Sequence, residues 1–346
     1  MNFKKNIFDK MCSPNSYIPS VYPDKKKIYV LGDIHGDYKL AIDLLLLTKC
    51  INICEHHDTV NWVGGSAFIV QVGDQVDRCR PNLDSMPPVL CENPATTIGD
   101  EASDIKILKL FSNLHEQAVR FGGAVISLFG NHEFMNSHGI MTYVSYKGLK
   151  EFDGYTDPKT KKQFEDGKDG RVHAFKPGNE IGKFLGCTRV GILIIGQYMF
   201  AHAGIINDFL TQYNIKTVND IDNINNALRG WLLDILDSKD ISTMDLLTMH
   251  PDSFTWTRKL GTIPPGAKMD HNICKKQLLP VLDKLNVKYL FIGHTPQCSG
   301  INSTCDDRLI RTDIGSSKAF ENFINNMGSR TPQVLKIKNN KMKVIS

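Results

Sequence analysis

The sequence has little that would tie the chain to a membrane or to a nucleic acid. A membrane-spanning helix needs about 20 consecutive apolar residues, and runs such as Leu44–Leu47 and Gly191–Ile195 are far shorter. The 41 basic and 37 acidic residues leave a net charge of +4, which lacks the clustered basic excess of a nucleic-acid-binding chain. We therefore expect neither a membrane nor a nucleic acid as a partner.

Regular cysteine spacing is absent as well. The nine cysteines are odd in number and irregularly spread, and Cys50, Cys54, His56 and His57 are not followed by a second pair at zinc-finger spacing. The first ten residues lack the apolar segment of a secretory signal. We therefore expect reduced thiols, no structural zinc and a cytoplasmic location.

What the sequence does contain is a series of short apolar runs that lead into polar residues. The runs have the length and composition of buried strands, and helical periodicity over residues 37–49 and 103–121 separates them. The runs 27–31, 68–72, 124–129, 198–201 and 287–292 lead into Asp33, Asp74, Asn131, His202 and His294. This alternation predicts a layered α/β fold, in which active groups gather beyond the carboxyl ends of the strands.

The rest of the chain divides by composition. Prolines and polar residues predict an irregular lead-in over residues 1–26, followed by a single domain over 27–346. Insertions are expected near 80–102 and 135–185, a core-facing helix over 218–237, and a β-hairpin over 333–345 around Asn339 and Asn340.

The polar residues fit a site for two divalent metal ions. Such a site holds the ions about 3.5–4 Å apart, with a shared ligand and a bound hydroxide. Asp33 and His35 are two residues apart, so an extended strand end places both side chains on one side. A carboxylate serves best as the shared ligand, while imidazole and amide groups fill the outer positions.

Five motifs then occur in order: GDIHG at 32–36, GDQVDR at 73–78, GNHE at 130–133, AHAG at 201–204 and GHTP at 293–296. Their order and spacing resemble those of the calcineurin-like metallophosphoesterases, and more narrowly of the phosphoprotein phosphatase family. GNHEFMN at 130–136, FTWTR at 254–258, GHTPQ at 293–297 and RTDIGSS at 311–317 are similar to the Shewanella-like branch of that family. The resemblance implies a β-sandwich of two mixed sheets flanked by helices.

The resemblance also implies a role for each matching residue. Asp33 and His35 would bind the first metal, Asp74 would bridge, and Asn131, His202 and His294 would complete the second. His132 would be the general acid and Asp77 its partner, while Arg78, Arg258 and Asn131 would bind the phosphate.

The chemistry of these side chains supports the implied roles. A carboxylate beside an imidazole favours its protonated form, which is a usable acid near neutral pH. Arginine stays charged and can bind a phosphate with two parallel hydrogen bonds. Two simpler interpretations remain open: Asp77 as a helix N-cap and Arg258 in a surface salt bridge.

One position departs from the family pattern, because Cys79 follows Arg78 where the motif usually has glycine. A side chain there would shift the loop if that turn needs a positive φ. A thiol this close to the predicted metals would also be open to oxidation or metal binding.

These observations together predict a metal-dependent phosphatase that hydrolyses phosphomonoesters with metal-activated water. The expected metals are two divalent ions, Mn²⁺ first, with Fe or Zn²⁺ as alternatives. The expected substrate is a phosphorylated protein or peptide, on serine/threonine or on tyrosine, and no regulatory partner is indicated. Two alternatives remain: a diadenosine-polyphosphate or other nucleotide phosphoesterase, and a non-catalytic binding module on the same fold.

Overall fold

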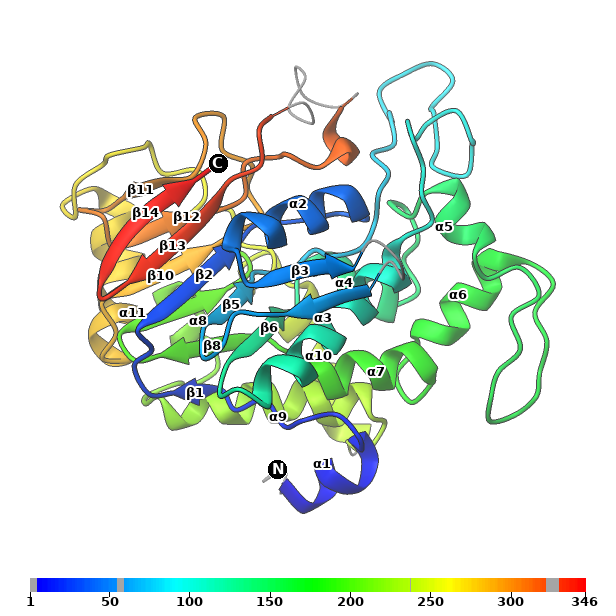
Figure 1. Cartoon of the computed structure of the whole chain (residues 1–346), viewed down its shortest axis with the longest axis horizontal. Helices are drawn as coiled ribbons and strands as arrows, with labels where there is room; N and C mark the ends of the chain where they lie inside the picture. The colour runs from blue at the N-terminus through cyan, green and yellow to red at the C-terminus, as the bar shows by residue number, and fades with distance from the viewer. Residues whose placement is uncertain (1–4, 55–58, 237, 322–329) are drawn as a thin grey trace.

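Two mixed β-sheets form the centre of the molecule in this computed structural model (Figure 1), which describes residues 5–54, 59–236, 238–321 and 330–346. Each sheet has six strands in that part of the chain. One has the order β14 (Lys341–Ile345), β13 (Val334–Lys338), β2 (Lys27–Leu31), β5 (Phe68–Gln71), β6 (Ala124–Leu128) and β7 (Arg189–Val190). The other has the order β1 (Val21–Tyr22), β8 (Ile192–Ile195), β9 (Tyr198–Ala201), β10 (Tyr289–Ile292), β12 (Leu309–Arg311) and β11 (Asn302–Thr304).

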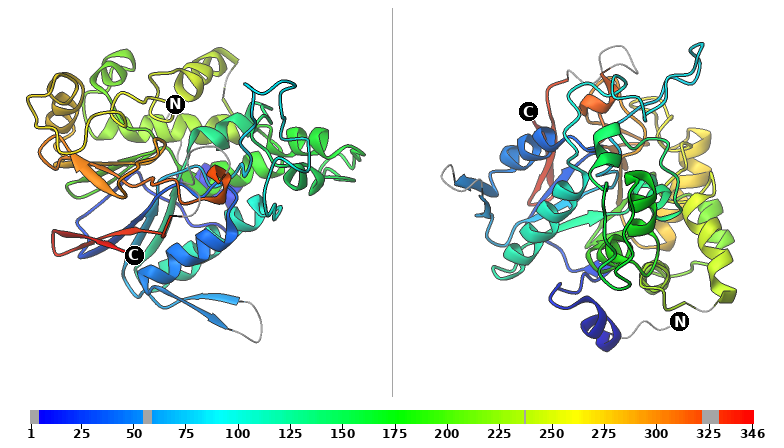
Figure 2. Two further views of the ribbon diagram at one scale, coloured as in Figure 1. Left: turned by 90° about the horizontal axis from the view of Figure 1, so that it is seen from above. Right: turned by 90° about the vertical axis from the view of Figure 1, so that its right-hand side faces the viewer.

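Helices cover the outer faces of both sheets, as the view from above shows (Figure 2, left). The helices α2 (Tyr38–Thr48) and α3 (Asp104–Val119) pack on the first sheet, where Leu45 and Phe111 join the core. The second sheet is covered by α7 (Glu180–Thr188), α8 (Asn207–Gln212), α9 (Asn219–Leu232), α10 (Ser238–Met249), the π-helix η1 (Cys274–Leu278) and α11 (Leu279–Lys284).

A separate apolar core lies between the two sheets. Val30 and Val70 of the first sheet and Phe200 and Phe291 of the second belong to it, and all four are fully buried. Strands that are buried on both faces read as continuous apolar runs rather than as alternating ones, which explains why the sequence predicted them well. The predicted sandwich of two mixed sheets flanked by helices is confirmed.

The direction of the strands determines where the site lies. Strands β2, β5 and β6 pair in parallel, so their carboxyl ends meet at one edge of the first sheet. Strands β9 and β10 pair in parallel in the second sheet. The predicted ligand residues follow these five strands.

The predicted hairpin at the end of the sequence is confirmed. Strands β13 and β14 pair antiparallel, and β13 also pairs antiparallel with β2. The turn residues Asn339 and Asn340 have φ values of 49° and 62°, a left-handed conformation that asparagine tolerates better than most residues.

Two segments contain more structure than the sequence predicted. The expected irregular lead-in includes α1 (Lys5–Cys12) and the short strand β1. The expected insertion over 135–185 includes the end of α4 (Asn131–Ser137), then α5 (Tyr146–Lys150), α6 (Gly167–Phe175) and most of α7. A small antiparallel pair, β3 (Ile51–Cys54) and β4 (Thr59–Trp62), and the 3-10 helix η2 (Lys318–Phe320) complete the described elements.

The expectation of reduced thiols is wrong for six of the nine cysteines. Disulfides join Cys12 to Cys187, Cys79 to Cys91 and Cys274 to Cys305. Their separations of 175, 12 and 31 residues follow no pattern that spacing alone could reveal. Because disulfides persist mainly in oxidising surroundings, the thiol argument for a cytoplasmic location loses its basis.

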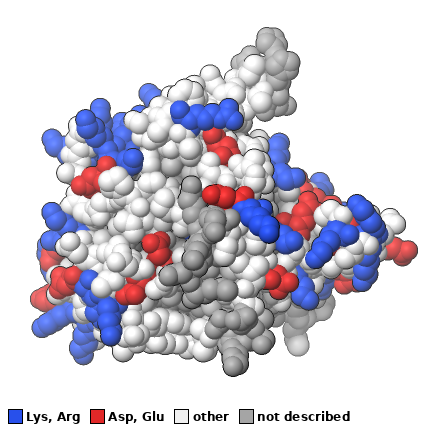
Figure 3. All heavy atoms as spheres, turned by 90° about the horizontal axis from the view of Figure 1, so that it is seen from below, with Lys and Arg blue, Asp and Glu red and all other residues white. Residues whose placement is uncertain are grey.

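Two further expectations concern the surface and the remaining cysteines. Cys50 is buried against the helices of the first sheet, while His56 and His57 of the rejected zinc motif lie outside the described residues. Basic and acidic side chains are interspersed on the face shown in Figure 3. None of the described helices has the length and apolar character needed to cross a membrane.

Candidate active site

The predicted metal ligands converge where the carboxyl ends of the two sheets meet. Asp33 and His35 follow β2, Asp74 follows β5, and Asn131 begins α4 directly after β6. From the second sheet, His202 follows β9 and His294 follows β10. These six residues are at most 5% exposed. The structure thus brings together all six ligands that the sequence indicated.

Tight turns bring the ligands to this position. His35, Asp74 and His294 have φ values of 46°, 52° and 65°, in the left-handed region that few non-glycine residues adopt. Such conformations cluster at functional sites. Gly73 has a φ of 103°, and a Cβ there would lie 2.6 Å from the Gly130 nitrogen and 2.8 Å from Nδ1 of His202. Only glycine therefore fits between β5 and the start of α4.

Asp74 lies at the centre of the cluster. Its Oδ2 is 3.2 Å from Nε2 of His202 and 3.7 Å from Nε2 of His35. Potential ligand atoms lie within 4.8 Å of one another in two groups, one of His35, Asp74 and His132 and the other of Asp74, His202 and His294. Both groups contain Asp74, so its carboxylate is placed where a ligand shared by two metals would be.

The imidazoles are oriented by backbone carbonyls. His202 Nδ1 lies 2.8 Å from the Val72 carbonyl, which leaves Nε2 beside Asp74 and 3.0 Å from Oδ1 of Asn131. His35 Nδ1 lies 3.3 Å from the carbonyl of Val76. A backbone acceptor on one ring nitrogen fixes the tautomer that presents the other nitrogen to a metal.

Several buried carboxyl groups lie close together in the cluster, and a bound cation would stabilise their charged forms. Burial, with the nearby charges of Asp313 and Asp74, raises the pKa of Asp33 well above its usual value. Burial likewise raises the pKa of Asp313 to about 6. Asp33 Oδ1 is buried and has no hydrogen-bond partner. An orphaned carboxylate oxygen beside further buried carboxylates and imidazoles is the donor chemistry that divalent metals take, so the residues fit the implied metals.

Burial and neighbouring charges shift the pKa values of Asp74, His202 and His294 in different directions. Burial opposes ionisation of Asp74, but the neighbouring His202 and His132 outweigh it and hold the Asp74 pKa well below its usual value. Burial also opposes the charge of His202, yet Asp74 raises the His202 pKa overall. For His294, burial and then the charges of His202 and Arg258 hold the pKa well below the usual value, and a neutral imidazole is the form that binds metals.

His132 and Asp77 form a close pair beside this cluster. The His132 Nδ1 is 2.7 Å from Asp77 Oδ2, and both residues are buried. Asn136 Nδ2 donates to the other Asp77 oxygen at 2.9 Å, and Arg171 Nη2 lies 3.6 Å from that oxygen. Asp77 does not begin a helix, so the N-cap interpretation is wrong.

The two predicted phosphate-binding arginines differ in their placement. Arg258 faces the site, where its Nη1 donates to the carbonyl of His294 at 3.3 Å. Among the described residues no carboxylate lies within ion-pair distance of Arg258, which leaves the salt-bridge interpretation without support. Arg78 is 2% exposed and bonds to the carbonyls of Gly36 and Gly99. Its predicted role as a phosphate ligand has no support in this geometry.

An open pocket of about 290 Å³ lies over the ligand cluster. Its lining includes five residues that the sequence analysis did not assign to the site: Arg80, Tyr143, Trp256, Pro296 and Phe320. For Arg80, the available signal was a second arginine two residues after Arg78. Trp256 lies in the motif FTWTR at 254–258, so that motif was the available signal for it, whereas Tyr143 and Phe320 lie in segments without apolar periodicity and could not be placed from the sequence.

Glu133 is a further residue that the sequence reasoning missed. Its carboxylate accepts hydrogen bonds from the backbone nitrogens of Asp74, Gln75 and Gly130 at 3.0, 2.7 and 2.7 Å. It therefore ties the loop after β5 to the start of α4. The letters GNHE contained the signal, since glutamate at the third helical position is typical of a capping box.

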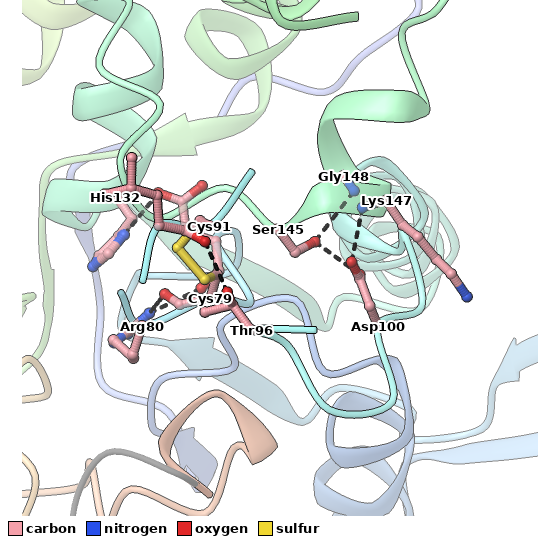
Figure 4. Close-up of a disulfide and its surroundings, with 11 residues drawn as sticks. Cys79, Arg80, Cys91, Thr96, Asp100, His132, Ser145, Lys147 and Gly148 are labelled. Atoms are coloured by element: carbon pink, nitrogen blue, oxygen red, sulfur yellow. Dashed lines mark hydrogen bonds and ion pairs between the residues drawn. A yellow bond between two sulfur atoms is a disulfide. The ribbon is translucent and has the colours of Figure 1, made fainter. Parts of the chain in front are cut away.

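Cys79 has a different role from the one considered for a free thiol. It is bonded to Cys91 (Figure 4), and its backbone nitrogen donates to the Tyr143 carbonyl at 3.0 Å. The positive φ of this loop belongs to Asp77, at 74°. Residue 79 therefore has no need of glycine, and the predicted oxidation-sensitive thiol is wrong.

Comparison with known proteins gives a consistent result. The family model described as calcineurin-like phosphoesterase matches residues 26–298. Shewanella-like protein phosphatase 2 of Arabidopsis thaliana is 25% identical over 94% of this chain and 78% of its own length. An uncharacterized protein of Acanthamoeba polyphaga mimivirus is 34% identical over 62% of this chain and 89% of its own.

Solved structures agree on the fold. The cold-active protein-tyrosine phosphatase of a psychrophilic Shewanella species superposes with a TM-score of 0.65 at 20% identity, covering 96% of this chain and 83% of that protein. At this identity the likeness concerns the fold alone.

Proposed function

Since the chain belongs to the calcineurin-like phosphoesterase family, we propose that it is a metal-dependent phosphatase that hydrolyses phosphomonoesters of phosphoproteins. The observation that carries the proposal is the convergence of the predicted ligand residues around the Asp74 carboxylate, beside the hydrogen-bonded pair of His132 and Asp77. Its support from relatives is the Arabidopsis thaliana protein phosphatase, which aligns with nearly the whole chain.

In this proposal Asp33, His35 and Asp74 hold one ion, and Asp74 together with Asn131, His202 and His294 holds the other. When bound, two such ions neutralise charge on a phosphoryl group and lower the pKa of a water molecule towards neutrality. We propose Mn²⁺ first, with Fe or Zn²⁺ as alternatives, and a set that mixes carboxylate, amide and imidazole donors is compatible with all three.

His132 is proposed as the general acid for the leaving oxygen. With Nδ1 donating to Asp77, the proton available for transfer sits on Nε2, which lies 3.9 Å from Asp74 Oδ2 on the side of the cluster. Asp77 orients the ring through this contact, while Asn136 holds Asp77 in place. Arg258 and the Asn131 amide are proposed to bind phosphoryl oxygens.

The test combines metal analysis with a substrate panel. The purified protein is stripped with a chelator and reloaded separately with Mn²⁺, Fe²⁺, Zn²⁺ or Mg²⁺. Turnover is then measured on p-nitrophenyl phosphate, phosphoserine and phosphotyrosine peptides, and diadenosine tetraphosphate. We expect activity to vanish on stripping, to return best with Mn²⁺, and to favour phosphopeptides.

Asp74→Asn tests the metal-binding part of the proposal. The side chain keeps its size, but the carboxylate proposed as the shared ligand becomes an amide. We expect the variant to bind less metal and to show no turnover. If the folded, metal-loaded protein shows no turnover, the alternative of a non-catalytic binding module is supported instead. If it clearly prefers diadenosine tetraphosphate, the substrate is a nucleotide rather than a phosphoprotein.

A further inference from the structure

Arg80 is a second arginine in the pocket, and the proposed function assigns it no role. It lines the same cavity as Arg258, His132 and the metal-ligand residues His35 and Asp74. In the close-up, Arg80 and the imidazole of His132 lie on the same side of the Cys79–Cys91 disulfide (Figure 4).

The surroundings of Arg80 hold its guanidinium group without neutralising it. Nη1 donates to the carbonyls of Asp77 and Cys79 at 3.1 and 2.8 Å. The guanidinium carbon lies 4.6 Å from the ring centroid of Phe320 and 5.6 Å from that of Tyr143. Stacking on aromatic faces leaves the N–H edge of an arginine free for a ligand.

The charge of Arg80 is not paired with a carboxylate among the described residues. Within the described parts of the chain no aspartate or glutamate lies within ion-pair distance of it, whereas the guanidinium of Arg78 lies 3.5 Å from Asp37. An unpaired cation beside metal ligands is suited to an anion that arrives with the substrate.

The disulfide fixes the residue directly before Arg80. Cys79 and Cys91 are both buried, with a Cα–Cα distance of 5.9 Å. Hydrogen bonds between Asn82 and Val89 close the loop between them. Arg80 therefore starts a short closed loop rather than a free one, and its backbone has few other positions to adopt.

We propose that Arg80 binds the non-bridging phosphoryl oxygens of the substrate together with Arg258, and that the Cys79–Cys91 disulfide positions it for this role. The inference deepens the proposed function and rests on it for the identity of the substrate anion. It differs from the motif-based expectation, which gave this role to Arg78.

The test measures the binding of inorganic phosphate to the metal-loaded protein by calorimetry, beside competitive inhibition by phosphate. Arg80→Gln is expected to weaken phosphate binding by about 10-fold or more, since a charge-assisted hydrogen bond is lost. Arg80→Lys keeps the positive charge but not the two parallel N–H donors of the guanidinium group. We therefore expect it to weaken phosphate binding less than Arg80→Gln does. Metal content is expected to stay that of the unmodified protein.

Matched controls separate the site from general effects. Arg120→Gln removes the charge of an exposed arginine at the end of α3 and is expected to bind phosphate normally. The double variant Cys79→Ser, Cys91→Ser is expected to weaken phosphate binding by about 3-fold or more. The double variant Cys12→Ser, Cys187→Ser opens a disulfide away from the pocket and is expected to leave binding unchanged.

The outcomes distinguish the inference from the proposed function. Phosphate binding within about twofold of the unmodified protein in Arg80→Gln overturns the role of Arg80. Unchanged binding in the Cys79, Cys91 double variant overturns the role of the disulfide. Absence of turnover in the unmodified protein counts against the proposed function alone, because phosphate binding is measured without turnover.

Discussion

At the scale of single residues, the hydrogen-bonded pair of His132 and Asp77 can be tested through the proposed general-acid role of His132. General acid catalysis contributes most where the leaving oxygen is poor. We predict that His132→Gln lowers kcat on phenyl phosphate or a phosphoserine peptide by about 10²–10⁴-fold. The loss on p-nitrophenyl phosphate is expected to be much smaller, because that leaving group needs little protonation. Steady-state rates on the three substrates check this.

His271→Gln provides the control, since this half-buried histidine lies in the turn before η1. It is expected to keep the activity of the unmodified protein on every substrate. An equal fractional loss on good and poor leaving groups in His132→Gln would show that His132 acts through metal binding instead. That alternative has a structural basis, because His132 forms one of the two possible ligand groups with His35 and Asp74.

The residues of the site could be predicted to different extents. The six predicted ligand residues follow apolar strands, and active groups gather beyond the carboxyl ends of strands in α/β folds, so their convergence could be inferred from the sequence. The choice between Arg78 and Arg80 could not. Both arginines flank Cys79, and only the folded chain shows that Arg80 lines the pocket while Arg78 bonds to the carbonyls of Gly36 and Gly99.

At the scale of elements, the segment before α6 depends on a buried carboxylate. Asp157 Oδ1 accepts from the backbone nitrogens of Lys159 and Thr160 at 2.8 and 2.5 Å, and Oδ2 lies 2.6 Å from Nε2 of His173 in α6. The hydrogen bond from Thr160 and then the one from His173 lower the pKa of Asp157. Ionised Asp157 therefore joins the loop over 157–162 to α6.

We predict that Asp157→Asn lowers Tm near neutral pH and that this difference shrinks in acid. A carboxyl whose pKa is lowered by folding stabilises the protein above its unfolded pKa, near 4, and this stabilisation is lost as the pH falls towards the folded value. Thermal unfolding of both proteins from about pH 7 to about pH 3 checks the sign. A difference in Tm that stays constant, or grows, as the pH falls would contradict it.

Asp166→Asn is a suitable comparison at this scale. Asp166 caps the start of α6 by accepting from the backbone nitrogens of Lys168 and Asp169, but it is exposed and its neutral amide still offers an acceptor oxygen. The effect of this substitution on Tm is expected to be small, because asparagine caps a helix about as well as aspartate does.

The elements themselves were predictable where burial imposes a pattern. Strands β2 and β9 begin and end where the sequence indicated, and α2 and α3 lie within a residue or two of the expected bounds. Helix α1 was missed because the prolines after it dominated the interpretation of the first 26 residues. Helices α5 and α6 were missed because their short, charged segments lack a clear apolar periodicity.

At the scale of the whole molecule, a disulfide links two segments that lie far apart in the sequence. Cys12–Cys187 attaches α1 to the end of α7 across 175 residues of chain. Nearby, Phe8 and Leu233 pack in the same apolar cluster. Neither residue of the disulfide has a sequence neighbour that predicts the other, so only the folded chain reveals this pairing.

The loss of this disulfide should have a measurable effect on stability. In the chain-entropy account, a cross-link stabilises by restricting the unfolded chain, and the effect grows with the length of the loop it closes. We predict that Cys12→Ser, Cys187→Ser lowers the free energy of unfolding by about 5 kcal/mol, against about 3 kcal/mol for Cys79→Ser, Cys91→Ser. Denaturant unfolding of both double variants checks the order.

Cys298→Ser completes the comparison, because Cys298 is a free and exposed thiol whose replacement should leave the free energy of unfolding unchanged. Reducing agent should destabilise the unmodified protein and leave each double variant less affected than its parent. If the Cys12, Cys187 variant loses less stability than the Cys79, Cys91 variant, loop length does not govern the effect. The apolar cluster of Phe8 and Leu233 would then be what holds α1 in place, and Phe8→Ala should produce the larger loss.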